Sequence, residues 1–324
     1  MIETKELLHK VSAALWQGRE NDGSLDCEYW HHRIRLQENL ALESVSPSIG
    51  LLGYAVDEGV RRNQGREGAI NGPDAIRNRL AKIPIHNQEK DLLDFGNICC
   101  EDRDLETAQA YLRKATHQLK TNGIFPIVLG GGHDITYGSY MGVRDYIKSK
   151  GEGKIGILNF DAHFDLRPMV DKPTSGTVFN QIYYDLRKEG EEFEYFVLGI
   201  QEQGNSKALF DVAKDLGTDF MTNFECELSN ISKVQNRLKQ FINKIDYLYI
   251  TIDLDGFSSA YAPGVSAPSP LGFEPKFVWI VLDFVAKNAE VVGCDIAELN
   301  PKFDIDNHTA SLAARLVDFL AIQK

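Results

Sequence analysis

Short runs of apolar and β-branched residues recur along the chain, and each run ends in a polar or glycine-rich segment. This pattern is typical of buried β-strands and predicts strands at residues 49–56, 124–129, 155–160, 195–200, 247–252 and 291–296. Longer amphipathic stretches lie between the runs and predict helices at residues 105–119, 234–241, 276–286 and 309–320. Because strands alternate with helices, we expect a parallel sheet that is covered by helices on both faces.

Nothing in this pattern divides the chain into separate modules. The 324 residues show no internal repeat, linker or shift in composition, and we therefore expect one domain over residues 1–324. Residues 1–45 hold many charges together with Trp16, Tyr29 and Trp30. This segment is expected to be an N-terminal extension that packs on the domain.

Composition and charge exclude several classes of protein. With 43% hydrophobic and 25% charged residues, the chain has neither a disordered nor a low-complexity composition. The 47 acidic side chains outnumber the 35 basic ones, and the net charge of −12 disfavours binding to nucleic acid or to an anionic membrane. No apolar run is long enough to span a membrane, and the N-terminus lacks the apolar core of a secretory signal. We therefore expect a cytoplasmic protein with reduced cysteines.

Polar residues that can bind metals follow four of the predicted strands directly. These segments are GGGHD at 130–134, DAHFD at 161–165, DLD at 253–255 and AE at 297–298. In an open parallel sheet, ligands bind in the crevice outside the carboxyl ends of the strands. Side chains as far apart in the sequence as His133 and Glu298 are therefore expected to converge on one site.

The charges of these segments predict a pair of metal ions. Four aspartates would converge without a lysine or arginine in the same segments, and crowded carboxylates resist joint ionisation. Two divalent cations would balance them, with two histidines as neutral ligands. The expected ligands are His133, Asp161, His163, Asp165, Asp253 and Asp255. This oxygen-rich set favours Mn²⁺ over zinc, although other divalent ions could bind, and such a pair activates water for hydrolysis.

Each motif by itself also has a structural explanation. An aspartate at a strand end commonly forms an Asx turn or caps the next helix, and the glycines at 130–132 could belong to a phosphate-binding loop. However, no GK[ST] or GxGxxG pattern follows these glycines. We therefore interpret them as positions of close backbone approach, and the conjunction of the four segments favours the metal site.

The segments GGGHD, NFDAHFD, TIDLDGF and DIAELNP resemble the ureohydrolase family of arginases, agmatinases and formimidoylglutamases, in order and spacing over roughly residues 48–320. The resemblance implies a three-layer α/β/α fold with an eight-stranded parallel sheet and two Mn²⁺ ions per chain. It assigns His133, Asp161, Asp165 and Asp253 to one ion and Asp161, His163, Asp253 and Asp255 to the other, with Asp161 and Asp253 bridging.

The same resemblance gives two acids a catalytic role. Asp165 would orient the nucleophile, and Glu298 would pair with the planar cation of a guanidinium or amidinium substrate. The alternative for Glu298 is a helix-capping acid before Asn300 and Pro301.

Two further segments resemble the formimidoylglutamase branch of this family. The segment SGTVFNQ at 175–181 has Phe179 where arginases and agmatinases carry a histidine. The loop GVRRNQGREGA at 59–69 is followed by NGP, and its Arg62, Asn63 and Arg66 are candidate substrate contacts because arginine binds carboxylates bidentately. Alternatively, the arginines of this loop pair with Glu58 and Glu67.

A third segment, APGVSAP at 262–268, also resembles this branch, and Phe179, Gln201 and Asn205 complete the expected substrate contacts. The leading hypothesis is hydrolysis of N-formimidoyl-L-glutamate to L-glutamate and formamide in histidine degradation. An agmatinase-like or guanidino-acid hydrolase is the second hypothesis, and a non-catalytic, metal-stabilised scaffold is the third. In the first two cases the partner is a small amidine or guanidine, and a homo-oligomer is possible.

Overall fold

The computed structural model describes residues 7–20, 27–40, 48–86, 89–151 and 153–324. Its centre is a sheet in which eight strands run parallel, as the family resemblance implies. In spatial order they are β6 (Asp91–Cys99), β4 (Ser48–Ala55), β7 (Ile124–Leu129), β12 (Val291–Ala297), β11 (Tyr247–Asp253), β8 (Ile155–Phe160), β9 (Glu194–Ile200) and β10 (Asp219–Thr222).

Two short strands extend this sheet along the outer edge of β6. β1 (Leu8–His9) is antiparallel to β6, and β3 (Ile34–Leu36) is parallel to it. The sheet therefore has ten strands, two more than predicted, because short pieces of the N-terminal segment pair with an edge that the central strands leave open. A separate pair joins β2 (Glu28–Tyr29) to β5 (Pro84–Ile85).

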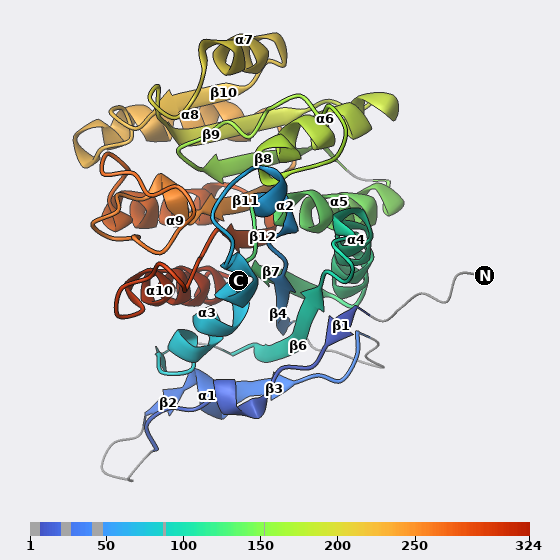
Figure 1. The fold of residues 1–324 in the computed structure, drawn as a ribbon, viewed down its shortest axis with the longest axis vertical. Helices are drawn as coiled ribbons and strands as arrows, with labels where there is room; N and C mark the ends of the chain where they lie inside the picture. The colour runs from blue at the N-terminus through green and yellow to red at the C-terminus, as the bar shows by residue number, and fades with distance from the viewer. Residues whose placement is uncertain (1–6, 21–26, 41–47, 87–88, 152) are drawn as a thin grey trace.

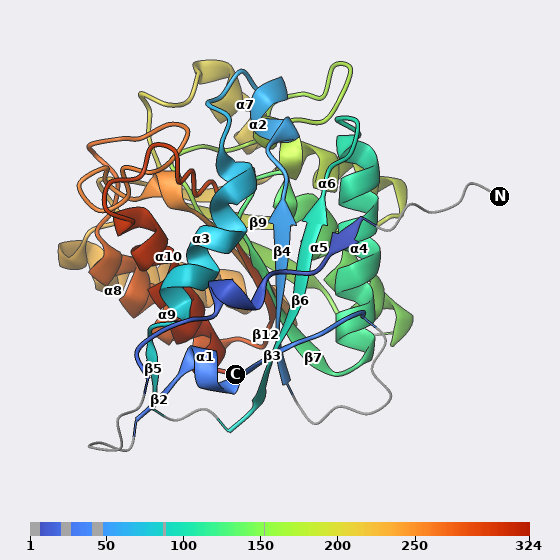
Figure 2. The ribbon, with the colours of Figure 1, turned by 60° about the horizontal axis from the view of Figure 1, so that its bottom comes forward.

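Helices cover both faces of the sheet, and the result is three layers (Figure 1). One face carries α3 (Gly72–Leu80), α8 (Ile231–Ile242), α9 (Pro275–Asn288) and α10 (His308–Ile322), and the other carries α4 (Leu105–Thr121), α5 (Ile135–Ser149) and α6 (Val178–Lys188). α7 (Lys207–Asp215) lies beyond the β10 edge, and α1 (Trp30–Arg33) lies near β3. Figure 2 shows the short α2 (Glu58–Arg62) at the carboxyl ends of the central strands.

The predicted elements agree closely with the structure. All six predicted strands are present with bounds shifted by one residue at most, and the four predicted helices extend by up to three residues at either end. Alternating side chains of these strands feed an apolar cluster on each face, which includes Leu158 and Ile250 on one side and Ile157 and Tyr249 on the other. The two-faced burial explains why these strands have almost continuous apolar sequences.

The apolar pattern does not predict β6, β10 or α5 to α7. β6 carries Asp94 in mid-strand, where the charge is buried against the Arg77 guanidinium at 2.8 Å. α5 contains Gly138 and Gly142, which normally disfavour a helix. A Cβ atom at Gly142 would lie 2.3 Å from the Arg113 carbonyl oxygen, so these glycines allow α5 to pack closely on α4.

The described parts of the N-terminal segment contact the rest of the chain through two tryptophans. Trp16 and Trp30 are buried, and their rings stack with centroids 6.5 Å apart. Trp16 Nε1 donates to Asp94 at 2.8 Å, and Trp30 Nε1 donates to Asp318 on α10 at 2.7 Å. The segment thus lies against the β6 edge and α10. Among the described residues, no helix has both the length and the apolarity that crossing a membrane requires.

Candidate metal centre

The four polar segments converge because the strands that precede them are neighbours. β7, β12, β11 and β8 are consecutive in the sheet, and His133, Glu298, Asp253 and Asp161 follow or end these strands at their carboxyl ends. His163 and Asp165 lie in the loop after β8, and Asp255 lies in the 3₁₀ turn η5 (Leu254–Gly256) after β11. The structure therefore brings together all six side chains that the sequence predicts as metal ligands.

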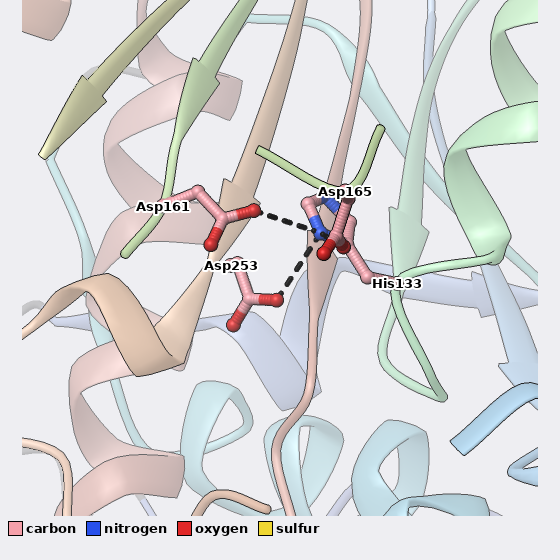
Figure 3. Close-up of side chains that lie close together, drawn as sticks. All are labelled: His133, Asp161, Asp165 and Asp253. Carbon is pink, nitrogen blue, oxygen red and sulfur yellow. Dashed lines mark hydrogen bonds and ion pairs between the residues drawn. The ribbon is translucent and has the colours of Figure 1, made fainter. Parts of the chain in front are cut away.

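The first group of ligand atoms surrounds the ring nitrogen of His133 (Figure 3). His133 Nδ1 lies 3.1 Å from Asp161 Oδ2, 3.0 Å from Asp165 Oδ2 and 3.1 Å from Asp253 Oδ2. One ligand atom from each of these four residues lies within 4.8 Å of all the others. Two atoms bound to one ion at about 2.1 Å and at right angles lie about 3 Å apart, so this spacing suits an octahedral cation.

The second group consists of Asp161, His163 and Asp255. His163 Nδ1 lies 3.0 Å from Asp255 Oδ2 and 3.5 Å from Asp161 Oδ1. Asp161 belongs to both groups, which fits a bridging carboxylate, whereas Asp253 belongs only to the first. Backbone amides orient both aspartates, since His163 N donates to Asp161 Oδ1 at 2.6 Å and Asp255 N donates to Asp253 Oδ1 at 2.8 Å.

The backbone at the site adopts unusual conformations. Asp165 and Glu298 have φ values of 49° and 67°, in the left-handed region that few non-glycine residues occupy. Such conformations cost free energy and occur often at functional sites. Gly131 has φ of 103°, and a Cβ atom there would lie 2.3 Å from the Tyr54 carbonyl oxygen. This glycine therefore permits the close backbone approach that the sequence indicates.

Residues that the sequence analysis did not identify orient His133. His133 Nε2 lies 3.0 Å from Thr251 Oγ1, and Thr251 Oγ1 donates to Asp295 Oδ1 at 2.6 Å. Because that hydroxyl donates to Asp295, it accepts from Nε2–H, so Nδ1 is the nitrogen that the neutral imidazole can offer to a metal ion. The hydroxyls of Ser139 and Tyr249 also donate to Asp295, which is fully buried. Thr251 lies two residues before Asp253 on β11, so the strand alternation points both side chains to the same face.

Phe179, a predicted substrate contact, lies beneath the ligands and not in the cleft. Its ring is fully buried, packs edge-on against the His133 ring at 5.4 Å and stacks on Tyr195 at 4.2 Å. The ring lies at the start of α6 and fills the space under His133, so it does not reach the cleft.

Burial and mutual repulsion shift the pKa values of the acids. Burial, together with the charges of Asp255 and Asp161, raises the pKa of Asp253 to about 7. Burial also raises the pKa values of Asp165 and Asp255, and it raises that of Glu298 well above its usual range. These shifts mean that the ionised carboxylates lack compensating positive charge.

The histidines and Asp161 respond to the same crowding. Burial opposes protonation of His133, but hydrogen bonds to Asp161, Asp165 and Asp253 raise its pKa well above the usual value. The charge of Asp255 raises the pKa of His163. Burial disfavours ionisation of Asp161, yet the hydrogen bonds from both histidines lower its pKa. The group as a whole therefore attracts positive charge.

The donor set fits divalent cations. Oxygen atoms dominate it, each predicted ion has one imidazole nitrogen, and among the described residues no cysteine belongs to either group. Asp255 Oδ1 is buried and has no hydrogen-bond partner, which is costly for a carboxylate unless a cation binds it. These residues can thus hold two divalent ions.

A cleft of about 290 Å³ opens above the ligands. Its walls include His163, Asp165, Asp253, Asp255 and Glu298 at one end, and Asn63, Arg66, Arg167, Ser175 and Asn205 among the other lining residues. Larger hollows elsewhere on the surface contain none of the metal-binding side chains. The sequence analysis did not name Arg167, which lies two residues after Asp165, and it included Ser175 only as the first residue of the segment 175–181.

The predicted substrate contacts divide into two sets. Asn63, Arg66 and Asn205 line the cleft, whereas Arg62 and Gln201 do not. The structure therefore does not place Arg62 and Gln201 in the lining of the cleft. Arg62 is turned into an ion-pair network with Glu58 and Glu106, and Gln201 Oε1 accepts from Ser269 Oγ at 2.6 Å.

Two of the cleft residues also make contacts within the chain. The Arg66 guanidinium donates to the carbonyls of Val265 and Ser266 and lies 3.9 Å above the Phe303 ring. Asn205 Nδ2 donates to two backbone carbonyls, and its Oδ1 accepts from Phe164 N at 3.0 Å. In contrast, no hydrogen bond or ion pair occupies the exposed Arg167 guanidinium within the described part of the chain.

Comparison with known proteins gives consistent relatives. A model of the arginase family matches residues 47–322. A formimidoylglutamase of Hahella chejuensis is 42% identical over 311 residues, which cover 95% of this chain and 94% of that protein. A formimidoylglutamase of Chromobacterium violaceum is 38% identical over 307 residues, which cover 94% of this chain and 96% of the relative.

Solved structures share the fold. The formimidoylglutamase from Bacillus subtilis superposes with a TM-score of 0.80 at 24% identity and covers 94% of both chains. The Trypanosoma cruzi formiminoglutamase with Mn²⁺ superposes with a TM-score of 0.74 at 23% identity, over 88% of this chain and 96% of that one.

Proposed function

Because this chain belongs to the arginase family, we propose that it hydrolyses N-formimidoyl-L-glutamate to L-glutamate and formamide. The observation that carries this proposal is the cleft, whose walls include four of the six metal-binding side chains and Glu298. The cleft also holds Arg167, whose guanidinium makes no hydrogen bond or ion pair within the described part of the chain. This arrangement suits a substrate that has a planar amidinium group at one end and two carboxylates at the other. The same proposal places the reaction in histidine degradation.

We propose that His133, Asp161, Asp165 and Asp253 hold one ion and that Asp161, His163 and Asp255 hold the second, with Asp253 also reaching it. Mn²⁺ is the proposed metal, because oxygen ligands with one imidazole per ion suit it better than zinc. When bound, such a pair supplies Lewis-acid activation of water at neutral pH.

The residues of this chain position and protonate the substrate. Glu298 Oε1 accepts from His133 N at 2.9 Å, which fixes the carboxylate at the cleft so that it can pair with the amidinium. The attacking water forms a bond to the formimidoyl carbon, and the bond from this carbon to the glutamate nitrogen breaks. A carboxylate oxygen of Asp165 takes a proton from the water and returns it to the departing nitrogen. Asp165 lines the cleft, so its carboxylate can reach the substrate.

Arg167 is the proposed anchor for a substrate carboxylate. Its guanidinium is exposed at the cleft, whereas those of Arg62 and Arg66 donate to groups of the chain itself. Asn63 lies next to it, because a Cβ atom at Gly176 would lie 3.0 Å from Asn63 Oδ1 and 3.3 Å from Arg167 Cδ. The two side chains together offer N–H donors to one carboxylate.

A direct test combines metal analysis with product detection. Purified protein loaded with Mn²⁺ should bind two ions per chain and release formamide and glutamate from formimidoylglutamate, with little activity on agmatine or arginine. Urea release from a guanidino substrate, without formamide from formimidoylglutamate, would show that the chain acts on guanidines. A folded, metal-loaded protein that is inactive on every amidine and guanidine would support the non-catalytic hypothesis.

A further inference from the structure

The arginine-rich loop at 59–69 predicts that its arginines bind the substrate carboxylates. In the structure, however, one of these arginines points away from the cleft. We propose that Arg62 is a positioning residue, which fastens the segment 166–175 to α2 and to the start of α4. In this way it sets where Asn63 and Arg167 meet the substrate carboxylates. The inference rests on the proposed function and specifies how the substrate-binding wall of the same cleft is held.

The contacts of Arg62 account for all of its donors. Nε donates to Glu58 Oε1 at 2.9 Å, and Nη1 donates to Glu106 Oε1 at 2.9 Å and to the Pro173 carbonyl at 3.2 Å. Nη2 donates to Glu106 Oε2 at 3.0 Å and to the Arg103 carbonyl at 3.1 Å. A guanidinium has five N–H groups, so none remains for a substrate. Its side chain is 8% exposed, and Arg62 is not among the residues that line the cleft.

The partners of Arg62 come from three separate segments. Glu58 lies one turn earlier on α2, Arg103 and Glu106 lie around the start of α4, and Pro173 lies in the loop that connects Asp165 to the 3₁₀ turn η3 (Ser175–Thr177). One buried side chain thus joins two walls of the cleft to a helix of the outer layer. The bidentate contact with Glu106 adds directional restraint that a lysine could not reproduce.

The segment 166–175 carries part of the substrate-binding wall. Arg167 N donates to the Gly176 carbonyl at 3.0 Å, and Thr174 N donates to Thr177 Oγ1 at 2.9 Å, so the segment closes on itself just before η3. Arg167 Cδ and the Asn63 amide both pack on Gly176. A shift of the Pro173 backbone would therefore change the spacing between Asn63 and Arg167.

The neighbouring Arg61 provides a matched control. It donates Nε and Nη2 to the same Glu58, at 2.6 Å each, but among the described residues no hydrogen bond or ion pair joins its side chain to the segment 166–175. Arg61 is 35% exposed, and its removal deletes the same type of side chain and a contact with the same partner, Glu58. The two arginines differ mainly in their connection to the cleft wall.

Hydrogen exchange measures the fastening directly. In Arg62→Ala, backbone amides in residues 166–177 should exchange about tenfold faster than in the wild type, because local opening no longer breaks the Arg62 contacts. In Arg61→Ala, the same amides should keep the wild-type rate. Equal acceleration in both variants, or none in Arg62→Ala, would overturn the proposal.

Kinetics then tests whether Arg62 affects substrate binding through Arg167. Arg62→Ala should raise KM for formimidoylglutamate about tenfold while kcat and the two bound ions are retained. The double variant Arg62→Ala/Arg167→Ala should have the KM of Arg167→Ala alone, because the two residues act on the same contact. Multiplied effects in the double variant, or a loss of metal in Arg62→Ala, would contradict this role.

Two further measurements distinguish failure of this proposal from failure of the proposed function. If Arg62→Ala does not fold, Glu106→Gln replaces it, since this variant removes the charge of a partner that is 45% exposed. It should accelerate hydrogen exchange in residues 166–177 and raise KM for formimidoylglutamate, each by a smaller factor than is expected for Arg62→Ala. A wild-type protein that releases no formamide would refute the proposed function. The exchange comparison does not depend on that activity and would still test the fastening by Arg62.

Discussion

The metal-binding cluster and the arginine-rich loop meet at the same cleft, yet sequence patterns predict them with different success. All six side chains that were expected to bind metal ions face one another at the ends of adjacent strands. Of the arginines in the loop, Arg62 is buried in ion pairs and Arg66 binds backbone carbonyls. The comparison teaches that a short side chain on a strand end has few possible partners, whereas a long cationic side chain in a loop has many.

The strongest test of the cluster is removal of the carboxylate that both ligand groups share. Asp161→Asn should abolish binding of both ions and lower kcat/KM by on the order of a thousandfold or more, because Asn cannot balance cationic charge. Metal analysis and formamide release measure the two effects. Asp171→Asn, at an exposed acid in the segment 166–175, is the control and should leave both unchanged. Full turnover of Asp161→Asn would refute the two-ion site.

The next test concerns the residues that orient His133. Thr251→Val removes the hydroxyl between His133 and Asp295, and it should weaken metal binding or activity by about 10- to 100-fold. Thr251→Ser retains the hydroxyl and should stay close to the wild type. Metal titration followed by electron paramagnetic resonance would report the loss. Equal behaviour of the two variants would show that the hydroxyl has no such role.

The substrate wall should respond differently from the metal cluster. Arg167→Ala should raise KM for formimidoylglutamate by about tenfold to a hundredfold, since hydrogen bonds to charged groups contribute about 1.5–3 kcal/mol. The bound metal should stay at two ions per chain. Steady-state kinetics with Lys172→Ala as an exposed control in the same segment separates a local contact from a general charge effect. An unchanged KM would remove Arg167 from the proposed site.

The last test concerns the pH dependence of stability. Without metal, the pKa of Asp253 is about 7 in the folded protein against an ordinary value of 3.8, so the folded state holds an extra proton between these values. The free energy of unfolding should therefore decrease as the pH rises from about 4 to 7. Bound ions compensate the same carboxylates and should flatten this slope. Thermal unfolding with EDTA and with Mn²⁺ at several pH values tests the difference, and identical slopes would contradict it.

Much of the fold follows from local patterns. The apolar runs predict six of the eight central strands, because residues buried on both faces of a sheet must be apolar almost throughout. β6 escapes prediction because Asp94 interrupts its run, and only α3 supplies the buried Arg77 that makes this charge tolerable. α5 is not predicted because its glycines disfavour a helix, and only the close packing of α4 against them explains their presence.

The sequence by itself determined the identity of the metal-binding side chains and their common location. A parallel sheet places the residues that follow its strands at one edge, and a short aspartate or histidine there cannot reach far from its own backbone. Only the tertiary structure decided which arginine stays available in the cleft. A long guanidinium side chain takes the acceptors that the folded chain brings within reach, and those acceptors come from α4, from the segment 166–175 and from the loop at 265–266.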